Sequence, residues 1–135
     1  MNRASLYLET FVPSAYYDFK DRKRMLETRR FWKSLKYYNV YVSALTLVEL
    51  RQARDPSKRK KLIDLVKNFK SLGITPEAEE LADEYMKEKI IPSRYREDAL
   101  HLAIASVNNI DYLVSWNFEH LVNIRTREAS ERIDK

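Results

Sequence analysis

Short apolar runs alternate along the chain with longer segments in which apolar residues recur at helical spacing. The runs predict β-strands because they are rich in β-branched and aromatic residues. They lie at residues 5–8, 40–42 and 112–114, with a very short one at Ile74. Strands that alternate with helices predict a parallel sheet, covered on both faces by right-handed crossovers. The predicted fold class is therefore α/β.

The helical segments are bounded by polar residues and prolines. Thr75 and Pro76 open one helix as its N-cap and first residue. A terminal helix or frayed tail is expected over 125–135, after a turn or short helix at 117–121. The other predicted helices span residues 20–38, 45–54, 57–71 and 98–108.

Length and composition narrow the class of protein. At 135 residues, 44% of them hydrophobic, the chain is expected to form one domain over residues 1–135. It has no cysteine, which excludes disulfides and thiolate metal sites. No apolar run approaches the roughly 20 residues of a membrane span, and residues 1–10 lack the pattern of a signal peptide. We therefore expect a cytoplasmic protein with no membrane partner.

Charge is distributed unevenly along the chain. The net charge is +5, but residues 20–36 and 58–61 are strongly basic while 77–88 are strongly acidic. Such asymmetry predicts one face suited to a polyanion. Solvated helix faces explain each run equally well when it is taken alone.

Acidic and amide side chains follow the predicted strands. Glu9 comes just after the first strand, Glu49 lies in the first turn of the helix after the second, and Asp98 starts an apolar helix. Asn117 follows the fourth strand. Because functional crevices in parallel sheets lie beyond the carboxyl ends of the strands, we expect these side chains to converge. An all-oxygen cluster suits Mg²⁺ or Mn²⁺, which can activate water and neutralise a phosphate.

Structural roles remain open for each acid. Thr46 and Glu49 match a capping-box pattern. Asp98 would be favoured by the macrodipole in the first turn of a helix. Glu9 would serve equally as a turn carboxylate.

Further candidates flank these positions. His101, one turn after Asp98, is either a supporting hydrogen-bond partner or a packing histidine. Trp116 would either stack on a base or pack in the core, and Ser115 would hydrogen-bond a ligand. Glu97 is expected to point away from Asp98. No glycine-rich phosphate loop is present, which disfavours a nucleoside triphosphate enzyme.

Four stretches in order resemble a known family. The chain resembles the PIN-domain proteins, the metal-dependent ribonuclease fold of VapC-type toxins in toxin–antitoxin pairs. The stretches cover nearly the whole chain: LYLET at 6–10, VSALTLVEL at 42–50, DALHLAIA at 98–105 and DYLVSWNFEHL at 111–121.

The resemblance implies positions for the site. The family's first acid, usually Asp, falls on Glu9, its second on Glu49 and its third on Asp98. The fourth falls on Asn117, which offers an amide oxygen without a charge. The resemblance also implies a three-layer α/β/α fold with a mostly parallel four-stranded sheet in the order 3-2-1-4. A fifth strand is often present, but no apolar strand follows Arg125, so it is expected to be missing or truncated.

Two hypotheses of function follow. In the first, Glu9, Glu49, Asp98 and Asn117 bind Mg²⁺ or Mn²⁺ in an endoribonuclease that hydrolyses RNA, and the resemblance implies a toxin with an antitoxin partner and a homodimer. In the second, the chain is a catalytically weak or inactive PIN-like module that binds RNA or a protein. A phosphotransfer enzyme ranks last, because it would need a nucleophilic Asp where Glu9 stands.

Overall fold

Four parallel strands form the centre of the fold. The structure is a computed structural model, and it describes residues 3–91 and 95–116. The strands are hydrogen-bonded in the order β3-β2-β1-β4, and Leu6 of β1 lies opposite Val40 on one side and Tyr112 on the other. The α/β class and the order 3-2-1-4 are confirmed. The strands are β1 (Ser5–Leu8), β2 (Asn39–Ser43), β3 (Lys70–Leu72) and β4 (Tyr112–Val114).

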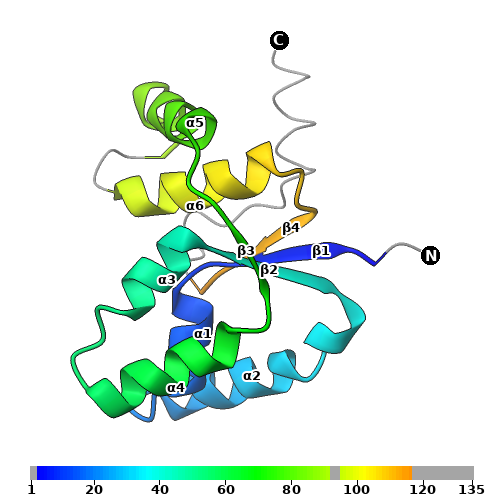
Figure 1. The fold of residues 1–135 in the computed structure, drawn as a ribbon, viewed down its shortest axis with the longest axis vertical. Coiled ribbons are helices and arrows are strands. Elements are labelled where there is room, and N and C mark those ends of the chain that lie inside the picture. The colour runs from blue at the N-terminus through cyan, green and yellow to red at the C-terminus, as the bar shows by residue number, and fades with distance from the viewer. Residues whose placement is uncertain (1–2, 92–94, 117–135) are drawn as a thin grey trace.

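Helices cover both faces of the sheet (Figure 1). One face carries α5 (Pro76–Lys87) and α6 (Arg96–Val107). The other carries α1 (Phe11–Tyr16), α2 (Arg22–Trp32) and α4 (Pro56–Val66). The helix α3 (Ala44–Leu50) contributes to both layers, because Leu45 is buried on one side and Leu50 on the other. This is the three-layer arrangement that the sequence predicts.

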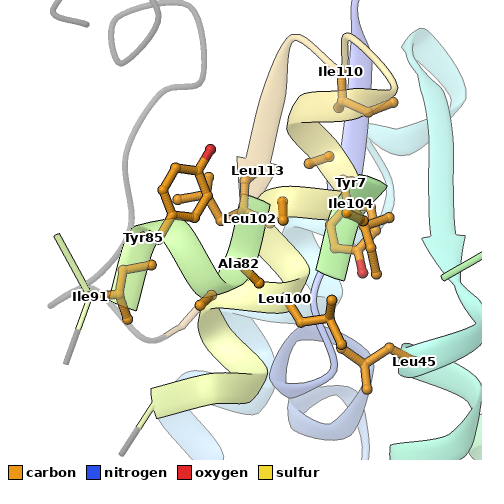
Figure 2. Packing of buried hydrophobic residues seen from close by; sticks show 14 residues of the cluster. Tyr7, Leu45, Ala82, Tyr85, Ile91, Leu100, Leu102, Ile104, Ile110 and Leu113 are labelled. Atoms are coloured by element: carbon orange, nitrogen blue, oxygen red, sulfur yellow. The ribbon is translucent and has the colours of Figure 1, made fainter. Parts of the chain in front are cut away.

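Each face of the sheet has its own apolar core. The first core lies against α5 and α6, and Figure 2 shows the ring of Tyr7 among its side chains. Residues 99–105 of α6 are all buried, and all of them except His101 are apolar, as expected for a helix segment enclosed by its neighbours. Burial of each large apolar side chain contributes about 1.5–3 kcal/mol. The second core includes Leu8, Val12, Val42, Leu62 and Val66.

Several helix boundaries differ from the predictions. The helix predicted over 20–38 is shorter: α2 ends at Trp32, and a 3-10 turn follows at Leu35–Tyr37. The hydroxyl of Ser34 donates to the carbonyl of Phe31 at 2.6 Å, which satisfies an acceptor at the end of the helix. Likewise, α3 ends at Leu50 and not near Arg54. The six-residue α1 was not predicted, because Pro13 and a short length hide it.

The third strand lies earlier than predicted. The helix expected over 57–71 ends at Val66, and residues 70–72 instead pair with β2 from Tyr41 to Ser43. Ile74, the predicted strand, is partly exposed and precedes the Thr75 cap. Pairing with a distant strand therefore overrode the local helical pattern.

Some predictions fall outside the described residues. The turn at 117–121, the tail at 125–135 and the missing fifth strand all lie there. Within the described ranges, no helix is long and apolar enough to cross a bilayer.

Candidate active site

The structure brings the three predicted carboxylates to one pocket. Glu9, Glu49 and Asp98 line a cavity of about 370 Å³, together with four neighbours. We call it the carboxylate pocket. It lies beyond the carboxyl ends of β1 and β2, where a parallel sheet places its functional crevice. The neighbours are Phe11, Tyr95, Glu97 and His101.

Backbone pairing places Glu9 at this edge. Its N–H donates to the carbonyl of Val114 at 3.1 Å, one residue beyond the end of β1. Its Oε1 accepts from the backbone N–H of Phe11 at 3.0 Å, at the start of α1. Glu9 is only 4% exposed. Burial is the largest influence on its pKa and raises it, and the nearby charge of Asp98 raises it further.

Opposing contacts moderate that shift. The backbone N–H of Phe11, the imidazole of His101 and the hydroxyl of Ser115 each lower the pKa of Glu9, but the net direction remains upward. A cation placed beside Glu9 would reverse this balance, since a nearby positive charge favours the ionised carboxylate.

Glu49 has a different environment. It lies in the last turn of α3, not in the first turn as predicted. The hydroxyl of Thr10 and Nε2 of His101 both donate to its Oε1 at 2.6 Å. Burial alone would raise the pKa of Glu49, but these two hydrogen bonds and the charge of His101 together lower it. Both bonds end on Oε1, so neither of them occupies Oε2.

A buried chain of hydrogen bonds supports His101. The ring is 3% exposed, and its Nδ1 lies 2.5 Å from the hydroxyl of Tyr7. Tyr7 in turn lies 2.7 Å from the hydroxyl of Ser43. Because Glu49 only accepts, the proton of the His101–Glu49 bond belongs to Nε2. His101 is thus a supporting partner of Glu49 and also a packed core residue.

Helix capping does not explain Glu49. The capping box of α3 consists of Ser43 and Thr46: the Ser43 hydroxyl accepts from the Thr46 N–H at 3.2 Å, and the Thr46 hydroxyl accepts from the Ser43 N–H at 3.3 Å. The capping box therefore begins at Ser43, three residues before Thr46, and the alternative in which Thr46 and Glu49 form it is wrong. Asp98 does lie in the first turn of α6, so a macrodipole role remains compatible with its position.

The remaining candidates are distributed as follows. Ser115 is 8% exposed and hydrogen-bonds Glu9. Trp116 packs against the second core, and its indole N–H donates to the hydroxyl of Thr28 at 2.8 Å. Glu97 also lines the carboxylate pocket, contrary to the expectation that it points elsewhere. Asn117 lies outside the described residues.

Sequence reasoning missed Tyr7, Ser43 and Thr10 as parts of the site. A tyrosine within a strand otherwise buried and aliphatic was the one available signal, because a buried hydroxyl needs a polar partner. The partner itself, His101, is 94 residues away, so only the fold identifies it.

The donor set of the carboxylate pocket fits a hard divalent cation. Its four carboxylates, the three predicted ones and that of Glu97, supply oxygen ligands of the kind that Mg²⁺ and Mn²⁺ prefer. Among the residues that the structure describes, no three His, Asp or Glu side chains already stand close enough together to hold an ion. The pocket is therefore a candidate by its chemistry and position, not by a preformed coordination sphere.

Comparison with known proteins identifies the fold. No family profile matches the sequence, and no curated protein matches it. VapBC2 from Rickettsia felis, solved bound to a DNA fragment from its promoter, superposes with a TM-score of 0.64 at 16% identity, over 85% of this chain and 89% of that one. VapC20 from Mycobacterium tuberculosis, a sarcin–ricin loop cleaving toxin, superposes with a TM-score of 0.67 at 20% identity, over 87% and 96%. The chain has the PIN-like fold of these VapC proteins, as the sequence resemblance predicts.

Proposed function

We propose that this chain is a divalent-metal-dependent endoribonuclease and the toxin of a toxin–antitoxin pair. The observation that carries the proposal is the carboxylate pocket, in which acids from three separate segments of the chain meet at the carboxyl edge of a PIN-like sheet. The likeness to VapC20, a toxin that cleaves the sarcin–ricin loop, supports RNA as the substrate. The likeness to VapBC2 supports an antitoxin as the partner.

In this proposal Glu9, Glu49 and Asp98 hold Mg²⁺ or Mn²⁺, and Asn117 adds a fourth oxygen. The cation, when bound, supplies a water of lowered pKa and neutralises charge on the phosphate. Glu49 is kept ionised and oriented by Thr10 and His101, so it is ready to bind without a change of protonation. Burial raises the pKa of Glu9, so a cation beside it would favour its ionised form.

Basic side chains of the run at residues 20–36 would hold the RNA backbone through sequence-independent contacts. Not all cations of the basic run serve this purpose. Arg29 is enclosed by the rings of Tyr16, Tyr17 and Phe19, and its Nε donates to the carbonyl of Tyr16 at 2.8 Å. The exposed cations of the run are Lys20, Arg22, Lys23, Arg30, Lys33 and Lys36.

A metal-dependent cleavage assay tests the proposal. The chain is incubated with structured and unstructured RNAs, with Mn²⁺ and with EDTA. We expect cleavage only with Mn²⁺, reduced by at least about 100-fold in Glu49→Gln and Asp98→Asn. Glu84→Gln, an exposed acid of α5 outside the pocket, is the matched control and should cleave normally. Full activity in both pocket variants would exclude this mechanism.

The second candidate is a catalytically weak or inactive PIN-like module. The lack of a preformed ion site among the described residues favours it, as does the cost of ionising buried Glu9. Calorimetric titration with Mn²⁺ separates the two. Mn²⁺ binding that disappears in Glu49→Gln and Asp98→Asn supports the nuclease. Absence of Mn²⁺ binding that depends on these residues supports the inactive module.

The proposed antitoxin and homodimer are tested separately. A small antitoxin gene beside this one would support the toxin assignment. Light scattering of the purified chain measures whether it is dimeric.

A further inference from the structure

A second pocket lies at the opposite edge of the sheet from the carboxylates. It measures about 370 Å³, and its lining includes Asn39 and Lys70, the first residues of β2 and β3. Glu9 and Glu49 follow the other ends of the strands. The five residues of β2, at about 3.3 Å each, separate the two edges by roughly 15 Å.

The charged side chains of this pocket are all basic. They are Arg3, Lys36 and Lys70. In the described part of the chain, no carboxylate forms an ion pair with any of them. Arg3 is oriented by a hydrogen bond from its Nη1 to the carbonyl of Lys36 at 3.0 Å. The pocket therefore concentrates positive charge that no ion pair among the described residues neutralises.

Aromatic rings form another part of the wall. Trp32, Tyr38 and Phe69 line the pocket and are only partly buried against the second core. The rings of Trp32 and Phe69 lie 5.7 Å apart between centroids, at 47°. Tyr37 does not line the pocket but lies between Lys36 and Tyr38 in sequence; it is 65% exposed, with the Lys36 ammonium 5.3 Å from its ring centroid. We call this site the basic–aromatic pocket.

We propose that the basic–aromatic pocket binds a single-stranded segment of RNA. Basic groups that track phosphates, combined with rings on which unpaired bases stack, are the chemistry of single-strand binding. An acidic peptide would match the cations but would leave the aromatic faces unused. The identity of the nucleic acid as RNA rests on the proposed ribonuclease function.

Fluorescence anisotropy in EDTA tests the inference without cleavage. The probe is a fluorescein-labelled oligoadenylate of about ten nucleotides. We expect Lys70→Glu to weaken binding and to reduce the slope of log K against log salt concentration by about one. Lys87→Glu, the same charge change on an exposed lysine of α5, is the matched control and should leave that slope unchanged. Tyr38→Leu should weaken binding at least about fivefold by removing a stacking surface.

The outcomes separate this inference from the proposed function. Binding that depends on Lys70 supports the pocket even if no cleavage is found with Mn²⁺. If the chain cleaves RNA with Mn²⁺ but Lys70→Glu and Lys87→Glu bind the probe equally well, the proposed RNA binding by the pocket is wrong. The proposed nuclease function is then still supported. Tighter binding of a duplex of the same length overturns the stacking role. If neither oligonucleotide binds, the proposal is wrong, and an acidic peptide becomes the better occupant. Circular dichroism confirms that each variant is folded.

Discussion

His101 Nε2 donates a hydrogen bond of 2.6 Å to Glu49 Oε1, although 52 residues separate the two in sequence. The same ring contacts Tyr7 through Nδ1, so one histidine joins a pocket carboxylate to a buried strand. Loss of a group that hydrogen-bonds and orients a metal ligand typically lowers metal affinity or activity about 10–100-fold. This relationship leads to the first prediction.

Two substitutions of His101 separate its two contacts. Gln places a donor near the Nε2 position, so His101→Gln should keep the bond to Glu49 and most of the Mn²⁺ affinity. Asn places an acceptor near the Nδ1 position, so His101→Asn should keep the partner of Tyr7 but weaken Mn²⁺ binding about 10-fold or more. Isothermal calorimetry measures both. Equal affinities in the two variants would show that the ring acts only in packing.

Removal of the Tyr7 hydroxyl tests the buried chain of hydrogen bonds. Tyr7→Phe should lower the free energy of unfolding by about 1–3 kcal/mol, because it leaves polar atoms of His101 and Ser43 without their buried partner. Urea unfolding gives the value. Tyr112→Phe, at a ring 39% exposed on β4, is the control and should change stability by less than about 0.5 kcal/mol. A similar change in stability in both variants would count against a stabilising role for the buried hydrogen bonds of Tyr7.

Glu9 gives a dependence of stability on pH. Burial raises the pKa of Glu9 in the folded chain, so the folded state binds this proton more tightly than the unfolded state. At low pH Glu9 is neutral in both states and costs nothing. As pH rises from the unfolded value of about 4.3 through the folded pKa, stability is progressively lost, and the loss is constant above it.

Glu9→Gln should therefore raise the melting temperature at pH 7 in EDTA and change it little near pH 4, at about the unfolded pKa. Thermal unfolding followed by circular dichroism measures both conditions. Glu84→Gln, at an exposed position, provides the control. A lower melting temperature for Glu9→Gln at pH 7 would contradict the assigned cost of the buried charge.

Bound Mn²⁺ should stabilise the wild-type chain, so its removal should lower the free energy of unfolding. Because a ligand that binds only the folded state stabilises it, Mn²⁺ at about 100 times its dissociation constant should add about 2.7 kcal/mol. EDTA should reverse the gain. The gain should be absent in Asp98→Asn, whose carboxylate is replaced in the pocket. Stabilisation by Mn²⁺ that is equal in both proteins would place the ion elsewhere.

The sequence alone determined the alternation of strands with helices and therefore the α/β class. The order of the strands was predicted from the resemblance to PIN-domain proteins. The sequence also determined that Glu9, Glu49 and Asp98 meet, because parallel strands present their carboxyl ends at one edge. The N-cap at Thr75 was also predictable from the sequence, because a capping pattern involves only residues that are close together along the chain.

Tertiary structure decided what depends on distant partners. Residues 70–72 became a strand because β2 offered them backbone hydrogen bonds, against a helical pattern. Glu49 is kept ionised because the fold brings Thr10 and His101 to it, and Glu9 resists ionisation because the fold buries it. Hydrogen bonding and desolvation act over a few ångströms in space, whereas the sequence specifies only neighbours along the chain.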